Sequence, residues 1–197
     1  AGRDRMRATL LSWLPADMHG MRLLDACCGT GALAVEAARR GAHVVAIDLS
    51  PTLVELAVRR VAQHLETFDN GGHIDFRSGD MLDPALGRFD HVVAMDSVIH
   101  YGTDDAVASL SRLAERTSGS IVFTFAPRTP ALAVMHAVGR LFPRTNRAPA
   151  IEPISERSLR ARLGGHSLLS QRGIRIGRCE RIDSAFYISQ AMELLRP

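Results

Sequence analysis

The chain has 197 residues, of which 46% are hydrophobic and 23% charged, the composition of an ordinary soluble globular domain. No apolar run is long enough to span a membrane, and a formal charge of +3 at pH 7 is too small to indicate a nucleic-acid partner. The three cysteines, two of them adjacent, fit neither a disulfide framework nor metal-ligand spacing. From the length we expect one domain over residues 1–197. Because no signal-peptide pattern opens the chain and the cysteines suit a reducing compartment, we expect it in the cytoplasm. The cysteine spacing predicts no protein-bound metal.

Predicted strands and helices alternate over the first 125 residues. The strands are apolar runs at residues 21–26, 43–47, 74–77, 89–95 and 120–125. Two helices cover residues 4–14 and 32–40, and two more begin at Ser50-Pro51 and at Thr103, with Ser50 and Thr103 as the expected N-caps. Because nearly continuous apolar strands alternate with helices, we expect a parallel sheet covered by helices on both faces.

The pattern changes after residue 125. Residues 126–151 contain no acid, and their apolar side chains recur at helical spacing, so we expect an insertion over about 127–155 that caps the carboxyl edge of the sheet. A short helix follows at 155–163, and residues 170–176 and 181–189 are predicted to form a closing hairpin. The prediction is an α/β fold with a seven-stranded, mostly parallel sheet and a C-terminal antiparallel hairpin.

A strand, a tight turn and a helix follow one another around Gly29 and Gly31. The glycines let the main chain approach a ligand closely, in front of a helix N-terminus. Gly29, Gly31 and Ala34 match the G-x-G-x-x-G/A dinucleotide pattern, and Asp48 ends the next strand about 20 residues on, as NAD binding requires. Asp25, however, would repel a pyrophosphate and suits the ammonium of a methionine-type cofactor. NAD and S-adenosylmethionine (SAM) both remain open here, with Asp25 favouring SAM.

The same segment resembles the D-x-G-x-G-x-G loop of class I SAM-dependent methyltransferases, and it departs from that loop at Cys27, where the family usually has glycine. The resemblance implies a Rossmann-like methyltransferase domain. It also implies that the cofactor is bound by Asp25, Cys27, Gly29, Thr30 and Gly31.

Further acids stand at the ends of the later strands. Asp48, with Leu49 beside it, is expected to accept hydrogen bonds from the two ribose hydroxyls. The Gly79-Asp80-Met81 segment resembles the methyltransferase acid that accepts from the adenine amino group, with Met81 beside the ring. NAD enzymes do not usually show this segment, which adds to the case for SAM. Since the carboxyl ends of parallel strands meet at one edge, we expect four acids to converge there: Asp25, Asp48, Asp80 and Asp96, the last near the methionine end of the cofactor.

His100 and Tyr101 follow the fourth strand, where a methyl acceptor must lie. The run D-S-V-I-H-Y from Asp96, the F-A-P-R-T-P that begins at Phe125 and the L-F-P at Leu141 are together similar to the magnesium-protoporphyrin IX O-methyltransferases of bacteriochlorophyll biosynthesis. The similarity extends from residue 6 to nearly the end of the chain. That family normally carries more residues ahead of the first strand, including part of a lid, so we expect the lid here to be either truncated or disordered.

The resemblance implies that SAM esterifies one propionate of Mg-protoporphyrin IX. A propionate, like a glutamate with its pKa of about 4.3, is ionised at pH 7 and needs little help from a base. Catalysis should therefore rest on in-line positioning, which can supply roughly 7–11 kcal/mol. We expect His100 and Tyr101 to orient the carboxylate. An axial bond from His100 to the porphyrin Mg is the weaker alternative, because Mg prefers oxygen ligands.

The insertion supplies the expected substrate contacts. Arg128 and Arg147 are candidates to clamp a propionate, and Met135 lies on the apolar face that would meet the porphyrin. The same acid-free segment would suit an anionic membrane, so peripheral association with the photosynthetic membrane is a further expectation. The resemblance also implies contact with the porphyrin-binding subunit of magnesium chelatase.

Three other functions compete with this interpretation. The nearest is a methyltransferase of another small hydrophobic acceptor, such as a quinone precursor. The second is a non-catalytic SAM-binding module, which would bind the cofactor without turning over an acceptor. The third, more distant, is an NAD dehydrogenase.

Overall fold

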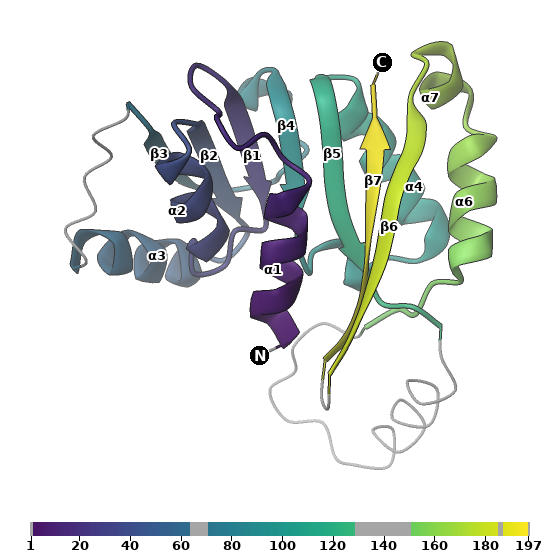
Figure 1. Cartoon of the computed structure of the whole chain (residues 1–197), viewed down its shortest axis with the longest axis horizontal. Helices are drawn as coiled ribbons and strands as arrows, with labels where there is room; N and C mark the ends of the chain where they lie inside the picture. Colours follow the sequence, from purple (N-terminus) through teal and green to yellow (C-terminus); the bar gives the residue numbers. More distant parts are fainter. Residues whose placement is uncertain (1, 64–70, 129–150, 185–186, 197) are drawn as a thin grey trace.

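The computed structural model describes residues 2–63, 71–128, 151–184 and 187–196. These residues form one seven-stranded sheet and the helices around it (Figure 1). The strand order is β3-β2-β1-β4-β5-β7-β6, with β1 to β5 parallel and β7 antiparallel to both of its neighbours. The strands are β1 (Arg22–Ala26), β2 (His43–Asp48), β3 (His73–Ser78), β4 (Phe89–Ala94), β5 (Thr117–Phe125), β6 (Arg175–Ser184) and β7 (Tyr187–Leu195). The predicted Rossmann-like, mostly parallel sheet with an antiparallel C-terminal pair is confirmed.

Helices cover both faces of the sheet. They are α1 (Gly2–Ser12), α2 (Ala32–Arg39), α3 (Pro51–Gln63), α4 (Thr103–Ala114), α6 (Glu156–Gly164) and α7 (Ser167–Gln171), with 3-10 turns η1 (Pro84–Leu86) and η2 (Val98–His100). Side chains of α1 and α2 pack with Leu23, Val44 and Val122 on one face. Side chains of α4, α6 and α7 pack with Leu24 and Phe123 on the other. Alternate residues of the strands thus face two separate apolar layers, as a sheet buried on both sides requires.

Two predicted boundaries were wrong. The closing hairpin was expected at 170–176 and 181–189, but its strands are β6 and β7, and residues 167–171 form the short helix α7. Thr103 is the first residue of α4, and Gly102 occupies the N-cap position without a side-chain hydrogen bond. By contrast, Ser155 caps α6 as predicted, since its side chain accepts from Ser158 N.

A buried ion pair joins the hairpin to α1. Glu193 of β7 is fully buried, and its two oxygens accept from Arg178 of β6 at 2.5 and 2.8 Å. Arg178 also donates to Trp13 O at 2.8 Å, and its guanidinium carbon lies 5.3 Å from the Trp13 ring centroid. The end of α1 is therefore tied to the edge strand β6, and α1 lies in front of the sheet with its axis roughly along the strands (Figure 1).

The insertion expected at about 127–155 can be followed only at its two ends. Pro127 pairs with Ile154, and Arg128 N donates to Ile154 O at 3.0 Å, so the chain leaves and rejoins the sheet at adjacent points. On its return, Glu152 N donates to Ile99 O at 2.8 Å. The returning end of this segment therefore lies against η2, which carries His100.

Candidate functional site

The glycine turn between β1 and α2 is held by main-chain hydrogen bonds. Cys28 N donates to Ile47 O at 3.0 Å, and Gly31 N donates to Cys28 O at 2.9 Å. Gly31 has a φ of +75°, and a Cβ there would meet the Phe76 ring at 2.9 Å, so this position requires glycine both for its conformation and for space. Cys27 has a φ of +66°, a left-handed conformation that costs a non-glycine residue roughly 1–2 kcal/mol.

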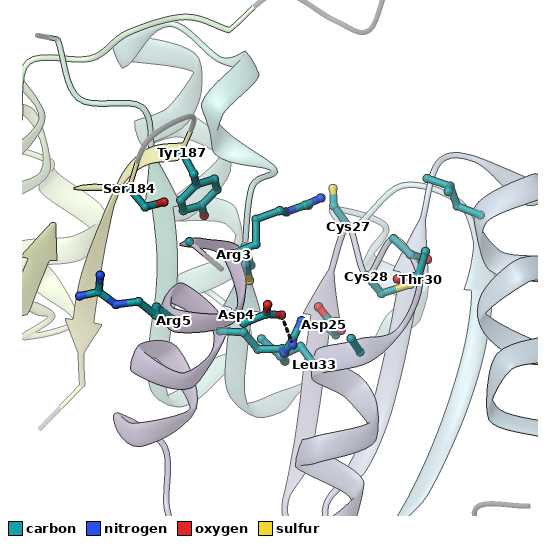
Figure 2. A pocket seen from close by; sticks show the side chains of 16 residues that line it. Arg3, Asp4, Arg5, Asp25, Cys27, Cys28, Thr30, Leu33, Ser184 and Tyr187 are labelled. Carbon is teal, nitrogen blue, oxygen red and sulfur yellow. Dashed lines mark hydrogen bonds and ion pairs between the residues drawn. The ribbon is translucent and has the colours of Figure 1, made fainter. Parts of the chain in front are cut away.

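A cavity of about 910 Å³ opens in front of this turn (Figure 2). Residues of the glycine turn form one side of it, and the start of α1 and the facing ends of β6 and β7 form the other. Its lining includes four of the predicted cofactor-binding residues: Asp25, Cys27, Gly29 and Thr30. A cavity of this size is in the range of small-molecule sites.

Asp25 is the buried acid of the cavity. Its side chain is 2% exposed, and Oδ2 has no hydrogen-bond partner among the described residues. Burial is the main reason that its pKa rises to about 7, although a hydrogen bond from Ala34 N acts in the opposite direction. A buried carboxylate oxygen without a partner is costly. The ammonium group of a SAM-type ligand would supply the missing cation, so the site fits this cofactor.

Asp48 and Asp80 also lie close enough to the glycine turn to affect the pKa of Cys27. Burial raises the pKa of the Cys27 thiol to about 11, and the charges of Asp48, Asp25 and Asp80 raise it further. The charges of Cys27 and Asp80 also contribute to the raised pKa of Tyr101, after burial as the first cause. The structure therefore brings three of the four predicted acids, together with Tyr101, to the glycine turn.

Asp48 and Asp80 both bind main-chain groups nearby. Asp48 Oδ2 accepts from Gly29 N at 3.0 Å, and its own carbonyl accepts from Gly79 N at 3.0 Å. Asp80 Oδ1 accepts from Leu82 N at 2.8 Å. Leu49 is 71% exposed beside this group, whereas Met81 is 5% exposed. The predicted ribose and adenine contacts of these residues remain predictions.

Asp96 has a different environment from the other acids. It has a φ of +56°, and its Oδ1 accepts from the Tyr187 hydroxyl at 2.9 Å and from Thr124 Oγ1 at 3.3 Å. Its Oδ2 pairs with Arg3 Nε at 3.0 Å. Arg3 and Tyr187 line the cavity, and neither was predicted from the sequence. No local motif marks them, because their contact with Asp96 joins positions 93 and 91 residues apart.

The predicted acceptor residues lie beyond the lining of the cavity. His100 ends η2 and is half-buried, and Tyr101, also half-buried, packs against the apolar core that contains Leu24 and Phe123. Arg128 is exposed at the end of a described segment. Arg147 and Met135 lie outside the described residues, as does most of the predicted insertion. The roles of His100, Tyr101 and these three residues therefore stay predictions.

Neither a metal-binding cluster nor a membrane-spanning helix is present among the described residues. No group of three or more His, Cys, Asp or Glu side chains there could hold a metal ion. None of the helices there has the length and apolar character needed to cross a membrane.

Comparison with known proteins places these features in a family. The model of the magnesium-protoporphyrin IX methyltransferase C-terminus matches residues 94–196, and a methyltransferase-domain model matches residues 23–118. The chain is 46% identical to the magnesium-protoporphyrin O-methyltransferase of Rhodobacter capsulatus over 192 residues, which cover 98% of this chain and 80% of the relative. It is 30% identical to the enzyme of that name from Synechocystis over 197 residues, covering 99% of this chain and 81% of the relative.

A solved structure supports the same similarity. The crystal structure of magnesium protoporphyrin IX methyltransferase (ChlM) from Synechocystis PCC 6803, with bound S-adenosylhomocysteine (SAH), matches with a TM-score of 0.80 at 29% identity. The match covers 100% of this chain and 84% of that one.

Proposed function

The chain belongs to the magnesium-protoporphyrin IX methyltransferase family, and from that premise we propose how its residues carry out the reaction. It is a SAM-dependent methyltransferase whose acceptor is Mg-protoporphyrin IX, in tetrapyrrole biosynthesis. We propose that the methyl group goes to a propionate carboxylate. The observation that supports SAM binding by this chain's own residues is the buried Asp25 oxygen, which lines the cavity and lacks a hydrogen-bond partner among the described residues.

The residues around the glycine turn divide the cofactor between them. When bound, SAM supplies an electrophilic methyl group on a positively charged sulfonium. Asp25 would hold the ammonium group, and Asp48, which already orders the loop through Gly29 N, would accept the ribose hydroxyls. Asp80 would accept from the adenine amino group. Three acids around one turn also favour a cationic ligand over an anionic one, which counts against the pyrophosphate of NAD.

The acceptor carboxylate needs positioning more than activation. A propionate is already ionised at pH 7, so the protein does not have to remove a proton from it. His100 and Tyr101 would donate hydrogen bonds that orient the carboxylate oxygen toward the methyl group. Support for this role comes from their place after β4 and from the electrostatic coupling of Tyr101 to Cys27 and Asp80. A direct bond from His100 to the porphyrin Mg remains the weaker alternative.

The porphyrin itself would be held by the segment that returns at Ile154. Arg128 and Arg147 would pair with propionates, and Met135 would contact the apolar macrocycle. The hydrogen bond from Glu152 N to Ile99 O supports this arrangement, because it ties one end of the segment to η2. Contact with the porphyrin-binding subunit of magnesium chelatase, and peripheral attachment to a membrane, would both shield a poorly soluble intermediate during transfer.

Product analysis tests the proposal. The purified chain is incubated with SAM and Mg-protoporphyrin IX. The pigment is then separated, and its molecular mass is measured by mass spectrometry. We expect one added CH₂ unit, removable by mild alkaline hydrolysis as an ester requires. A parallel reaction with a quinone precursor should yield no methylated product. Methylation of the quinone precursor alone, or tight SAH binding without turnover of either acceptor, would contradict the proposal.

A further inference from the structure

Three parts of the chain that are distant in sequence meet beside the cavity. They are the first turn of α1, the facing ends of β6 and β7, and the end of β4. Gly2 is buried there, and a Cβ on it would overlap Ser184 Oγ and the Tyr187 side chain. Only a residue without a side chain lets α1 approach the hairpin this closely. The position of the next residue, Arg3, is therefore set by packing.

Asp96 is the polar centre of this junction. Its carboxylate is 11% exposed and receives hydrogen bonds from Tyr187 and Thr124, while its main-chain N–H donates to Thr124 Oγ1 at 2.8 Å. These bonds hold a non-glycine residue in the left-handed region, a conformation that persists only where its surroundings enforce it. The Asp96 carboxylate thus has a fixed direction before any ligand arrives.

Arg3 uses that carboxylate as an anchor. Its Nε lies 3.0 Å from Asp96 Oδ2. Within the described residues, this is the one ion pair of the Arg3 side chain, and it uses Nε alone. Both terminal Nη groups can therefore donate to another acceptor. Figure 2 shows the Arg3 side chain leaving α1 and extending along the cavity toward Cys27 on the glycine turn. Its side chain is 71% exposed, so solvent or a ligand can reach it.

We propose that Arg3 is a carboxylate-binding residue of this cavity, and that Asp96 and Tyr187 are its positioning residues. Two parallel Nη–H groups match the two oxygens of a carboxylate, whereas Nε is already occupied. The inference rests on the proposed function, because that reaction brings two carboxylates to the site. One is the amino-acid carboxylate of the cofactor, and the other is a propionate of the acceptor.

The charges of the cavity support a carboxylate at Arg3. Arg7, which also lines the cavity, already pairs with Asp4 at 2.7 Å. The buried side of the cavity carries Asp25, which would hold a cation. A ligand that carries an ammonium group and a carboxylate on one carbon needs an anionic side chain for the first and a cationic side chain for the second. Asp25 would supply the anion, and Arg3 would supply the cation.

The test compares two ligands that differ only in the amino-acid part. SAH carries the ammonium and the carboxylate, whereas 5′-methylthioadenosine lacks both. Calorimetric affinities for both ligands, and kcat and KM for Mg-protoporphyrin IX, are measured for the full chain and for Arg3→Gln, Arg3→Lys and Tyr187→Phe. Arg59→Gln is the matched control, because Arg59 is 72% exposed and pairs with a carboxylate, Glu55, on α3.

If Arg3 holds the cofactor carboxylate, Arg3→Gln should weaken SAH at least tenfold and leave methylthioadenosine affinity unchanged. If it holds a propionate, both affinities should persist and KM for the porphyrin should rise at least tenfold. In either case Arg3→Lys should lie between wild type and Arg3→Gln, and Tyr187→Phe should change the same quantity in the same direction. A purely structural role would instead change the melting temperature and both ligands alike.

The inference is overturned if Arg3→Gln behaves like Arg59→Gln in all three measurements. In that case SAH binding and turnover by the wild-type chain would leave the proposed function intact. A wild-type chain that bound neither ligand would contradict the proposed function itself.

Discussion

Gly29 N lies 3.0 Å from Asp48 Oδ2, and the other oxygen of the same carboxylate accepts from Ser50 N at 2.9 Å. One side chain at the end of β2 therefore connects the glycine turn to the start of α3. A carboxylate has lone pairs for about four hydrogen bonds, so these two contacts leave capacity for ribose hydroxyls. Asp48 would then shape the loop and bind the ligand at once.

Asp48→Ala should weaken both functions. We expect at least a tenfold loss of affinity for SAH and for 5′-methylthioadenosine alike, because both ligands carry the ribose. Unfolding in urea should show a loss of about 1–2 kcal/mol, since two main-chain N–H groups lose their acceptor. Asp48→Asn keeps one acceptor oxygen and should recover part of the stability. Normal affinity for both ligands in Asp48→Ala would exclude the ribose contact.

The raised pKa of Asp25, about 7, predicts pH-dependent cofactor binding. Below pH 7 the buried carboxyl carries a proton and cannot pair with the ammonium group. Affinity for SAH should therefore fall as the pH drops from 7 to 5, while affinity for 5′-methylthioadenosine should stay constant. Asp25→Asn should bind SAH weakly without this dependence. A wild-type profile that is flat from pH 5 to 7 would contradict the assignment.

The same shift predicts a trend in the stability of the ligand-free chain. The unfolded carboxyl titrates near 3.8, whereas the folded one keeps its proton up to about pH 7. Between these values the folded state binds more protons, so the Asp25 contribution to stability is lost as the pH rises, by up to about 4 kcal/mol. The free energy of unfolding, measured in urea at pH 5 and pH 8, should fall more in wild type than in Asp25→Asn.

His100→Ala should separate turnover from cofactor binding. We expect kcat to fall at least tenfold, which corresponds to about 1.4 kcal/mol, because the acceptor carboxylate loses an orienting hydrogen bond. The affinity for SAH should change by less than about twofold. His100→Gln, which keeps a neutral donor, should retain part of the activity. Unchanged kcat in His100→Ala would remove this residue from the acceptor site.

Arg178→Met tests the anchor between α1 and the hairpin. Glu193 is fully buried, and the substitution would leave its charge without a partner. We expect a loss of about 3 kcal/mol in urea unfolding, at the low end for broken buried pairs because Arg178 is itself half exposed. Arg175→Met, an exposed change on the same strand, should cost less than about 0.5 kcal/mol. Equal effects would show that the pair contributes nothing specific.

The central strands were predictable because each is buried on both faces and is apolar throughout, as Val44 and Val45 of β2 illustrate. The hairpin was placed wrongly for the opposite reason. Arg178 and Glu180 make β6 read as polar surface, and Glu193 interrupts the apolar pattern of β7. Only the contact between Arg178 and Glu193 explains how a charge can stand in a buried strand. Sequence periodicity contains no information on such a pair.

The site divides in the same way. Asp25 and Asp48 could be proposed from sequence because each stands at a strand end beside a local glycine pattern. The partners of Asp96 could not, since Tyr187 approaches it from an antiparallel strand 91 residues later and Arg3 from the first helix. The ligand contacts of all these residues remain predictions that the binding experiments above decide.

The antiparallel insertion of β7 between β5 and β6 has a kinetic consequence. A chain that has assembled only β1 to β4 already carries the acids of the glycine turn, but it lacks the hydroxyl that fixes Asp96. Joining the two ends of the molecule closes the longest loop in the fold, and such non-local contacts form slowly. During refolding, the capacity to bind a carboxylate at Arg3 should therefore return in a late phase, after most of the sheet signal has been regained.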